Sequence, residues 1–288
     1  MILLYIEDKI LSGTIATYLD YLNLDYTTNI NHKVECAIVA EINPKTRKIA
    51  QTTKTIFIAY LEEQKIYTKF MKKNKVSKQY KEKILKFFED CTNIVVSMPI
   101  FQKIISTSTN ITVIPKEPFQ LNLVKTKKGK DIVFYDPKYQ NLNMIYELSI
   151  HYPKLKFYYV GYKNELTMRE RTTFNKLPNN VIKYKKMDII SYMNLVNSAY
   201  IVIHNDIDDF YQIPILLKKN LIIKDIPYYE NFLIPSKDCY FYDNFKSLVL
   251  KLEKIKNRRL SNLTDEVYCK LSKIDCKYVS YKYQILLV

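Results

Sequence analysis

The sequence is poor in glycine: only 3 of its 288 residues are glycine, where an average globular composition would supply roughly 20. Gly13, Gly129 and Gly161 stand far apart in the chain. Phosphate-binding loops and nucleophile elbows need clustered glycines, because these let the backbone turn sharply and approach a substrate closely. The scarcity therefore excludes the G-x-G-x-x-G, P-loop and G-x-S-x-G motifs.

Clustered cysteines and long apolar segments are also lacking. The 5 cysteines are scattered, form no C-x-x-C pair and have no histidine beside them, which is typical of reduced thiols rather than of a zinc site. No apolar run reaches roughly 18 residues, and the N-terminal MILLYIEDKI lacks the basic region and cleavage site of a signal peptide. We therefore expect a cytoplasmic protein that meets a membrane only at its surface.

Acidic residues are outnumbered. The chain carries 45 Lys or Arg and 29 Asp or Glu, which gives a net charge of +16. Such an excess favours an anionic partner, namely nucleic acid, acidic lipid or a phosphorylated substrate. A composition rich in Lys, Asn, Ile and Tyr also arises from AT-rich coding without selection for binding, so both origins of the charge stay open.

The first part of the chain alternates short apolar runs with helical or irregular stretches. Continuous apolar character predicts buried strands at Met1–Ile6, Ala37–Ala40, Thr55–Tyr60, Asn93–Val96 and Ile111–Ile114. Helical spacing of apolar residues predicts a helix over Ile10–Leu22. This alternation is typical of a parallel sheet covered by helices on both faces.

The pattern restarts after the polar, basic segment Leu121–Lys130, the best candidate for a linker. Further strands are predicted at Asp131–Tyr135, Leu155–Val160, Val181–Tyr184, Tyr200–His204 and Asn220–Lys224. Further helices are predicted at Asn141–Tyr152, Met187–Ser198, Ile213–Lys219 and Phe245–Arg258.

We therefore predict an α/β fold of two Rossmann-like domains facing a central cleft. The first domain covers residues 1–122 on the acceptor side, and the second covers residues 123–258 on the nucleotide side. Residues 259–288 are expected to pack back on the first domain. Domains of this kind bind ligands at the carboxyl ends of their strands, at a topological switch point.

Six segments resemble, in order and spacing, landmarks of the nucleotide-binding domain of GT-B glycosyltransferases. They are ITVIPKEPF (Ile111–Phe119), DIVFYDPKYQNL (Asp131–Leu142), YPKLKFYYVGY (Tyr152–Tyr162), LPNNVIKY (Leu177–Tyr184), NSAYIVIHNDIDDF (Asn197–Phe210) and NLIIKDIPYYENFL (Asn220–Leu233). The chain is thus similar to a divergent member of the glycosyl transferases group 1, or family 4-like, enzymes. The resemblance implies a GT-B fold and transfer of a hexose from a nucleotide sugar.

The resemblance also implies a donor site. Lys138 matches the lysine that contacts the donor diphosphate, a leaving group that needs fixed positive charge or helix N-termini near its phosphates. The stretch from Asn180 to Tyr184 matches the segment that meets the nucleotide base, and His204 ends a strand beside the donor loop. The residues implied in nucleotide-sugar binding are Lys138, Gly161, Asn180, Val181, Tyr184 and His204. No metal and no other cofactor is expected.

Four carboxylates are the catalytic candidates. Asp208 or Asp209 corresponds best to the first of the family's paired glutamates, which hold the sugar. At the position of the second glutamate the chain has Leu216 and Leu217, and the arginine that the family places before Lys138 is absent. On the acceptor side, the strand TIFIAYLEEQ ends in Glu62 and Glu63, either of which could act as a base or orient an acceptor hydroxyl.

A lysine-rich segment spans residues 65–86, KIYTKFMKKNKVSKQYKEKILK. It holds nine lysines and one acid with apolar and aromatic residues interleaved, and each lysine near an anionic bilayer contributes about 1 kcal/mol to binding. The candidate membrane-binding residues are Lys69, Phe70, Met71, Lys72, Lys73 and Lys75. Such a segment could also follow a nucleic-acid backbone, but the lack of any known nucleic-acid-binding motif disfavours that partner.

Three functions are compatible with these patterns. The first is a cytoplasmic glycosyltransferase of glycan or glycolipid biosynthesis, with a nucleotide-sugar donor, a lipid or glycan acceptor and an anionic membrane surface as partners. The second is a degenerate, non-catalytic GT-B subunit that supports a partner glycosyltransferase. The third is a basic α/β protein that binds nucleic acid. Titration with UDP, GDP and their sugars tests the first function directly.

Overall fold

The computed structural model describes residues 1–72, 75–116, 129–161, 166–184, 187–229, 233, 239–257, 268, 271 and 273–287. The chain divides into two compact units. Unit 1 comprises Met1–Pro118, Pro227–Phe232 and Lys273–Val288, and unit 2 comprises Phe119–Ile226 and Leu233–Ser272. The predicted domain boundary at residues 122–123 lies outside the described residues.

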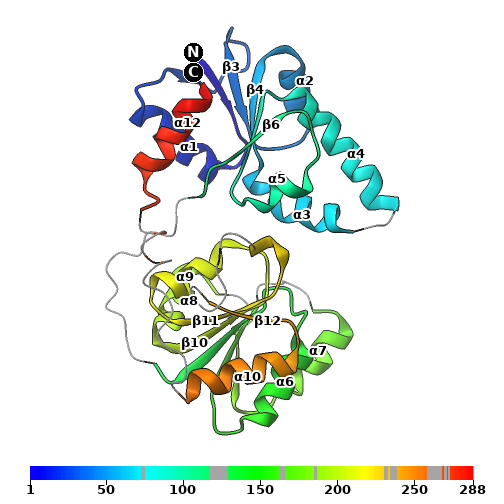
Figure 1. Cartoon of the computed structure of the whole chain (residues 1–288), viewed down its shortest axis with the longest axis vertical. Helices are drawn as coiled ribbons and strands as arrows, with labels where there is room; N and C mark the ends of the chain where they lie inside the picture. The colour runs from blue at the N-terminus through cyan, green and yellow to red at the C-terminus, as the bar shows by residue number, and fades with distance from the viewer. Residues whose placement is uncertain are drawn as a thin grey trace. The chain divides into compact units, whose positions relative to one another are not determined.

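Unit 1 is built on a six-stranded parallel sheet of order β2-β1-β3-β4-β5-β6 (Figure 1). Its strands are β1 (Ile2–Tyr5), β2 (Tyr26–Thr27), β3 (Cys36–Val39), β4 (Lys54–Ile58), β5 (Asn93–Val96) and β6 (Asn110–Val113). The elements around it are α1 (Lys9–Tyr21), α2 (Pro44–Thr52), η1 (Ala59–Leu61), α3 (Glu63–Met71), α4 (Lys75–Asp90), α5 (Ile100–Ile104), η3 (Pro227–Tyr229) and α12 (Cys276–Leu287).

Helices cover both faces of this sheet, as its continuous apolar strands require. On one face, Ile56 and Ile58 join the core that α1 and α12 complete, where the rings of Tyr18 and Tyr283 stack at 5.7 Å. On the other face, the intervening Phe57 packs edge-on against Phe87 of α4 at 5.1 Å. The C-terminal helix therefore belongs to the first sheet.

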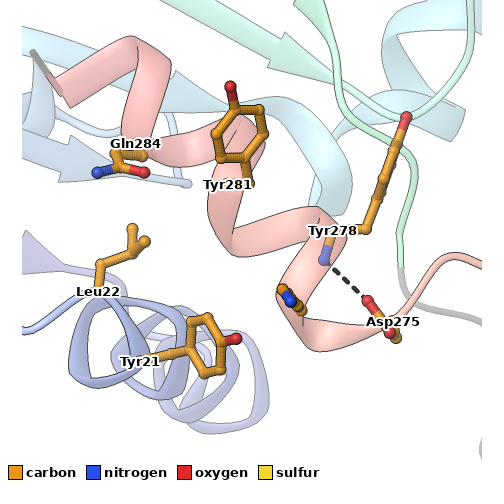
Figure 2. A pocket seen from close by; sticks show the side chains of 7 residues that line it. Tyr21, Leu22, Asp275, Tyr278, Tyr281 and Gln284 are labelled. Carbon is orange, nitrogen blue, oxygen red and sulfur yellow. Dashed lines mark hydrogen bonds between the residues drawn. The ribbon is translucent and has the colours of Figure 1, made fainter.

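A surface pocket of about 360 Å³ lies between the C-terminal end of α1 and α12 (Figure 2). Tyr21 and Leu22 line it from the side of α1, and Tyr278, Tyr281 and Gln284 line it from α12 (Figure 2). The Asp275 carboxylate at its rim accepts a hydrogen bond from the backbone N–H of Tyr278 at 2.8 Å (Figure 2). The lining contains none of the residues predicted to bind donor or acceptor.

Unit 2 also has a six-stranded parallel sheet, of order β12-β11-β10-β7-β8-β9 (Figure 1). Its strands are β7 (Asp131–Tyr135), β8 (Phe157–Val160), β9 (Val181–Tyr184), β10 (Ala199–His204), β11 (Asn220–Lys224) and β12 (Tyr240–Tyr242). Strands β8 and β9 follow β7 on one side, and β10, β11 and β12 follow on the other. Strand order therefore reverses between β7 and β10, as in a Rossmann fold.

The helices of unit 2 again cover both faces of the sheet. They are α6 (Leu142–His151), α7 (Met168–Asn175), α8 (Ile189–Ser198), η2 (Asp209–Tyr211), α9 (Gln212–Leu216) and α10 (Phe245–Lys256). Phe134 and Ile203 face the core formed with α6 and α10. Tyr135, next along β7, lies on the opposite face, where its ring contacts Tyr192 of α8 at 5.2 Å.

These sheets confirm the prediction of an α/β fold with two Rossmann-like domains. Strands β5, β7, β9 and β11 have the predicted bounds. Within the described residues, none of the helices has both the length and the apolar character that crossing a bilayer requires.

Candidate functional site

The switch point of the unit 2 sheet lies at the carboxyl ends of β7 and β10. Tyr135 and His204 end these strands and are partners in the sheet register. Two loops leave the sheet here: residues 136–141 lead to α6, and residues 205–208 lead to η2. Parallel α/β sheets bind ligands at this place, so the two loops frame the candidate site.

Asp136 fixes the first loop. Its buried carboxylate accepts hydrogen bonds from the backbone N–H groups of Gln140 (3.2 Å) and Asn141 (2.7 Å) and from the Tyr159 hydroxyl (2.7 Å). Burial raises the pKa of Asp136, and these donors act against that rise. The loop is therefore held to the sheet, while Lys138 at its outer turn keeps 44% of its side chain exposed.

Asn205 fixes the second loop. Its backbone N–H and its side-chain Nδ2 both donate to the carbonyl oxygen of Tyr135, at 3.1 and 3.0 Å. Its Oδ1 accepts a hydrogen bond from the hydroxyl of Tyr242, at the end of β12. The start of this loop is thus tied to strands on both sides of β10.

Asp208 is surrounded by three polar groups. The Tyr135 hydroxyl donates to Oδ2 at 2.7 Å, and the backbone N–H of Phe210 donates to Oδ1 at 2.9 Å. His204 Nε2 lies 3.3 Å from the same Oδ1. The hydrogen bond from Phe210 makes Asp208 the N-cap of η2. These contacts place the Asp208 carboxyl group at the end of β10 in a single orientation.

Aromatic rings pack around this carboxyl group and leave 23% of the Asp208 side chain exposed. The Tyr135 ring stacks on the His204 ring at 4.9 Å and on the Phe210 ring at 5.5 Å. Burial consequently raises the pKa of Asp208 to about 7 and lowers the pKa of His204 to about 4. At neutral pH His204 is uncharged, so the two side chains do not form an ion pair, and Asp208 changes charge close to physiological pH.

Lys138 and Asp206 join the two loops. Lys138 Nζ lies 2.8 Å from Asp206 Oδ1, and the same oxygen accepts a hydrogen bond from the backbone N–H of Ile207 at 2.8 Å. The Asp206 side chain is 13% exposed. The negative charge of Asp206 also contributes to the raised pKa of Asp208.

The arrangement combines two chemical capacities at one sheet edge. The exposed Lys138 ammonium can bind an anionic group such as a phosphate. The Asp208 carboxyl group can donate a hydrogen bond to a hydroxyl when protonated and accept one when ionised. Within the residues that the structure describes, no group of three or more His, Cys, Asp or Glu could hold a metal ion.

The remaining predicted donor residues lie along β8 and β9. Gly161 and Tyr184 lie at the carboxyl ends, where the Gly161 N–H donates to the Tyr184 carbonyl at 3.0 Å. Asn180 and Val181 lie at the amino end of β9. The Asn180 side chain donates to the carbonyl of Leu155 at 3.1 Å and to two further carbonyls. Asn180 therefore ties backbone segments together at the edge opposite the switch point, a place that does not fit a role in base binding.

The two acceptor-side carboxylates follow β4 in unit 1. Glu63 is 1% exposed, accepts hydrogen bonds from the backbone N–H and hydroxyl of Ser97, and lies 3.7 Å from Lys116 Nζ. Glu62 is partly exposed and pairs with Lys65 at 3.2 Å. Glu63 thus links the ends of β4 and β5 from a buried position, while Glu62 is the one that solvent reaches.

The lysine-rich segment forms α3 and α4. Phe70 is 8% exposed and packs inside unit 1, so its predicted contact with a membrane does not fit its burial. Met71 at 49% and Val76 at 63% are the exposed apolar side chains of this segment. Lys69 and Lys72 lie at the end of α3, Lys75 begins α4, and Lys73 lies outside the described residues.

Sequence reasoning missed the residues that support the site. Tyr135, Asp136, Asn205 and Asp206 were not predicted, although each lies at or next to the end of a predicted strand. Their position directly after apolar runs was the available signal, because polar residues at strand ends line the binding edge of a parallel sheet.

The chain matches no protein-family model and no curated protein. Its fold, however, is shared with solved structures that include a glycosyltransferase and a UDP-GlcNAc 2-epimerase. The two Rossmann-like units and these structural neighbours identify the fold as GT-B.

Three solved structures illustrate the similarity. Anabaena Alr3699/HepE in complex with UDP and glucose is 11% identical with a TM-score of 0.69, over 100% of this chain and 99% of that chain. A glycosyltransferase from Rickettsia africae is 13% identical with a TM-score of 0.67, over 99% and 97% of the two chains. UDP-GlcNAc 2-epimerase from Neisseria meningitidis, bound to UDP-GlcNAc, is 10% identical with a TM-score of 0.53, over 96% and 88%. The fold therefore serves both transferases and epimerases.

Proposed function

We propose that this protein is a glycosyltransferase that passes a hexose from a nucleotide sugar to a hydroxyl of a lipid or glycan. The observation that carries the proposal is the combination, at one switch point, of the exposed Lys138 ammonium with the oriented carboxyl group of Asp208. The likeness to structures solved with UDP, glucose and UDP-glucose supports a nucleotide sugar as donor.

In the proposed mechanism, Lys138 neutralises charge on the diphosphate as the bond to the sugar breaks. Asp208, or Asp209 beside it, hydrogen-bonds a sugar hydroxyl. His204 and Tyr135 act through Asp208 by fixing its orientation. Lys138 supplies positive charge for the leaving group, so the proposed mechanism requires no metal. Glu62 is the acceptor-side carboxylate that a substrate hydroxyl can reach.

The proposal also includes binding of the enzyme to a membrane surface. The exposed lysines of α3 and α4, together with Met71 and Val76, would hold the protein at an anionic membrane surface on the cytoplasmic side. A lipid-linked acceptor would then lie close to the enzyme.

A second candidate function is that of a non-catalytic GT-B subunit that supports an active partner. Leu217 favours this function. It stands at one of the two positions that correspond to the family's second glutamate, and its side chain is buried in the apolar core at 2% exposed. A subunit of this kind would bind a nucleotide sugar without consuming it.

Titration with nucleotides tests the proposal. We expect UDP or GDP and the corresponding sugars to stabilise the protein, by about 2.7 kcal/mol at a hundredfold excess over Kd. Lys138→Ala should weaken diphosphate binding by roughly tenfold to a hundredfold, since hydrogen bonds to charged groups are worth about 1.5–3 kcal/mol. Denaturation with and without nucleotide measures the stabilisation, and isothermal titration calorimetry measures the affinity.

The matched control is Lys156→Ala, which removes an exposed lysine just before β8, at the opposite edge of the same sheet. It should leave the affinity unchanged. Absence of binding by every nucleotide sugar would refute the donor site. Binding without release of nucleoside diphosphate over time, with lipid and glycan acceptors supplied, would favour the non-catalytic subunit.

A further inference from the structure

Asp206 forms an ion pair with Lys138, the cation that the proposed donor diphosphate needs. Its Oδ1 lies 2.8 Å from Lys138 Nζ, and the same oxygen is held by the backbone N–H of Ile207 at 2.8 Å. The carboxylate is therefore fixed by its own loop and does not depend on Lys138 for its place. Lys138, on the other loop and 44% exposed, is the partner that can move.

A diphosphate bound at Lys138 meets this carboxylate. Two negative groups would then share one ammonium, and like charges about 4 Å apart repel appreciably even in a watery environment. Burial raises the pKa of the neighbouring Asp208 to about 7, so Asp208 is only partly ionised near neutral pH and adds less repulsion. Asp206 is thus the carboxylate placed to compete with a bound diphosphate for the Lys138 ammonium.

We propose that Asp206 is an internal competitor of the donor diphosphate: it holds Lys138 when the site is empty and lowers the affinity of the site for nucleoside diphosphates. The inference rests on the proposed function, since it concerns the same donor site. The effect of Asp206 should differ between the nucleotide-sugar donor and the nucleoside diphosphate product. A free nucleoside diphosphate carries about one more negative charge near neutral pH than a nucleotide sugar, because its terminal phosphate has a second ionisation. Asp206 therefore opposes the product more than the donor and favours product release.

The test is Asp206→Asn, which removes the charge and keeps an oxygen that can accept from the Ile207 N–H. The ligands are uridine, UDP and UDP-glucose, with GDP and GDP-mannose as a second set, and calorimetry gives each Kd. We expect UDP, or GDP, to bind about tenfold more tightly to the variant. The gain should be smaller for the nucleotide sugar, and the uncharged nucleoside should show none.

Two further variants make the result specific. Asp225→Asn is the matched control, because Asp225 is an exposed carboxylate that follows β11 at the same sheet edge; it should change UDP affinity less than twofold. In a Lys138→Met background, Asp206→Asn should gain less than threefold, since no ammonium is left to release. If Asp206→Asn does not fold, Asp206→Ser gives the same comparison.

The outcomes separate this inference from the proposed function. Diphosphate binding by the wild type with no gain, or with a loss, in Asp206→Asn would overturn the inference and leave the donor site standing; a loss would mean that Asp206 orients Lys138. A loss in Asp206→Asn that appears only with Mg²⁺ and disappears in EDTA would also overturn it, by making Asp206 a cation ligand. Failure of wild type and Asp206→Asn alike to bind any of these nucleotides would refute both.

Discussion

Asp208 and His204 together keep about one proton in the folded protein over a wide pH range, because burial shifts their pKa values in opposite directions. Burial holds the pKa of Asp208 at about 7 and that of His204 at about 4, so between these values the proton stays on Asp208. In the unfolded chain, Asp has a pKa of about 3.9 and His of about 6.5, so one proton stays on His204 over nearly the same range. Folding therefore changes the proton count of the pair little, and its contribution to stability is nearly independent of pH.

Single substitutions should expose two opposite slopes. In His204→Gln, folded Asp208 binds a proton that the unfolded chain lacks between about pH 4 and 7, so the free energy of unfolding falls as pH rises. In Asp208→Asn, unfolded His204 binds a proton that the folded chain lacks between about pH 4 and 6.5, so the free energy of unfolding increases with pH. Each slope is at most about 1.4 kcal/mol per pH unit.

Urea denaturation at several pH values in this range, with each variant compared to the wild type, measures the slopes. The double variant His204→Gln/Asp208→Asn should return to the wild-type pH profile. Parallel profiles for the two single variants would contradict a neutral pair in the folded protein.

At the scale of elements, the loop between β7 and α6 packs against the end of β8, where the Tyr139 ring lies against Gly161. A Cβ added to Gly161 would lie 2.2 Å from the Cζ atom of Tyr139. Tyr139 is 2% exposed, packs against Phe174 and Tyr159, and directly follows Lys138 with a positive φ of 55°. The absence of a side chain at Gly161 thus keeps the loop that carries Lys138 in place.

Gly161→Ala should therefore destabilise unit 2 by about 1–3 kcal/mol, the usual cost of overpacking a buried site, and weaken diphosphate binding with it. Gly13→Ala is the control, because Gly13 lies inside α1 with open space around its Cα; alanine there should stabilise by up to about 1 kcal/mol. Denaturation and calorimetry of both variants check this. The double variant Gly161→Ala/Tyr139→Leu should recover stability if the clash with the Tyr139 ring is the cause.

The sequence predicts elements well where burial makes the pattern continuous. Strands β7, β9 and β11 follow residue for residue from their apolar runs, because a parallel sheet buries both faces. Helix α3 was obscured by its lysines, although Ile66, Tyr67 and Phe70 form its buried side. Edge strands such as β2 (Tyr26–Thr27) are too short to give a period.

In the candidate site, too, the sequence predicts some features and not others. The order of strands and loops placed Lys138 and Asp208 at the switch point. The acids between His204 and Phe210 show no periodicity, however. The pairing of Asp206 with Lys138 and the approach of His204 to Asp208 therefore depend on backbone torsions that the sequence does not display. For the same reason, Asn180 was assigned to the base pocket although its side chain ties three carbonyls together.

At the scale of the whole molecule, the net charge of +16 is unevenly distributed. In the segment from residue 65 to residue 86 nine lysines accompany one acid, and Lys72, Lys78, Lys83 and Lys86 are exposed there. Met71 and Val76 add exposed apolar area beside them. Basic side chains next to apolar ones are what binding to an anionic bilayer surface requires.

Neutralising four of these lysines should separate membrane binding from a general effect of charge. The quadruple variant Lys72→Gln, Lys78→Gln, Lys83→Gln and Lys86→Gln loses about 1 kcal/mol per lysine near the surface, so partitioning onto vesicles with 30% anionic phospholipid should fall at least tenfold. The control replaces four exposed lysines of unit 2, Lys154, Lys156, Lys246 and Lys254, and changes the net charge equally. Flotation of both variants at about 0.15 M salt measures the partitioning. At this ionic strength charges are screened over about 8 Å, so only lysines that face the lipid contribute to docking. If the two variants float alike, binding depends on the total charge of the protein, and the α3–α4 surface is not a docking site.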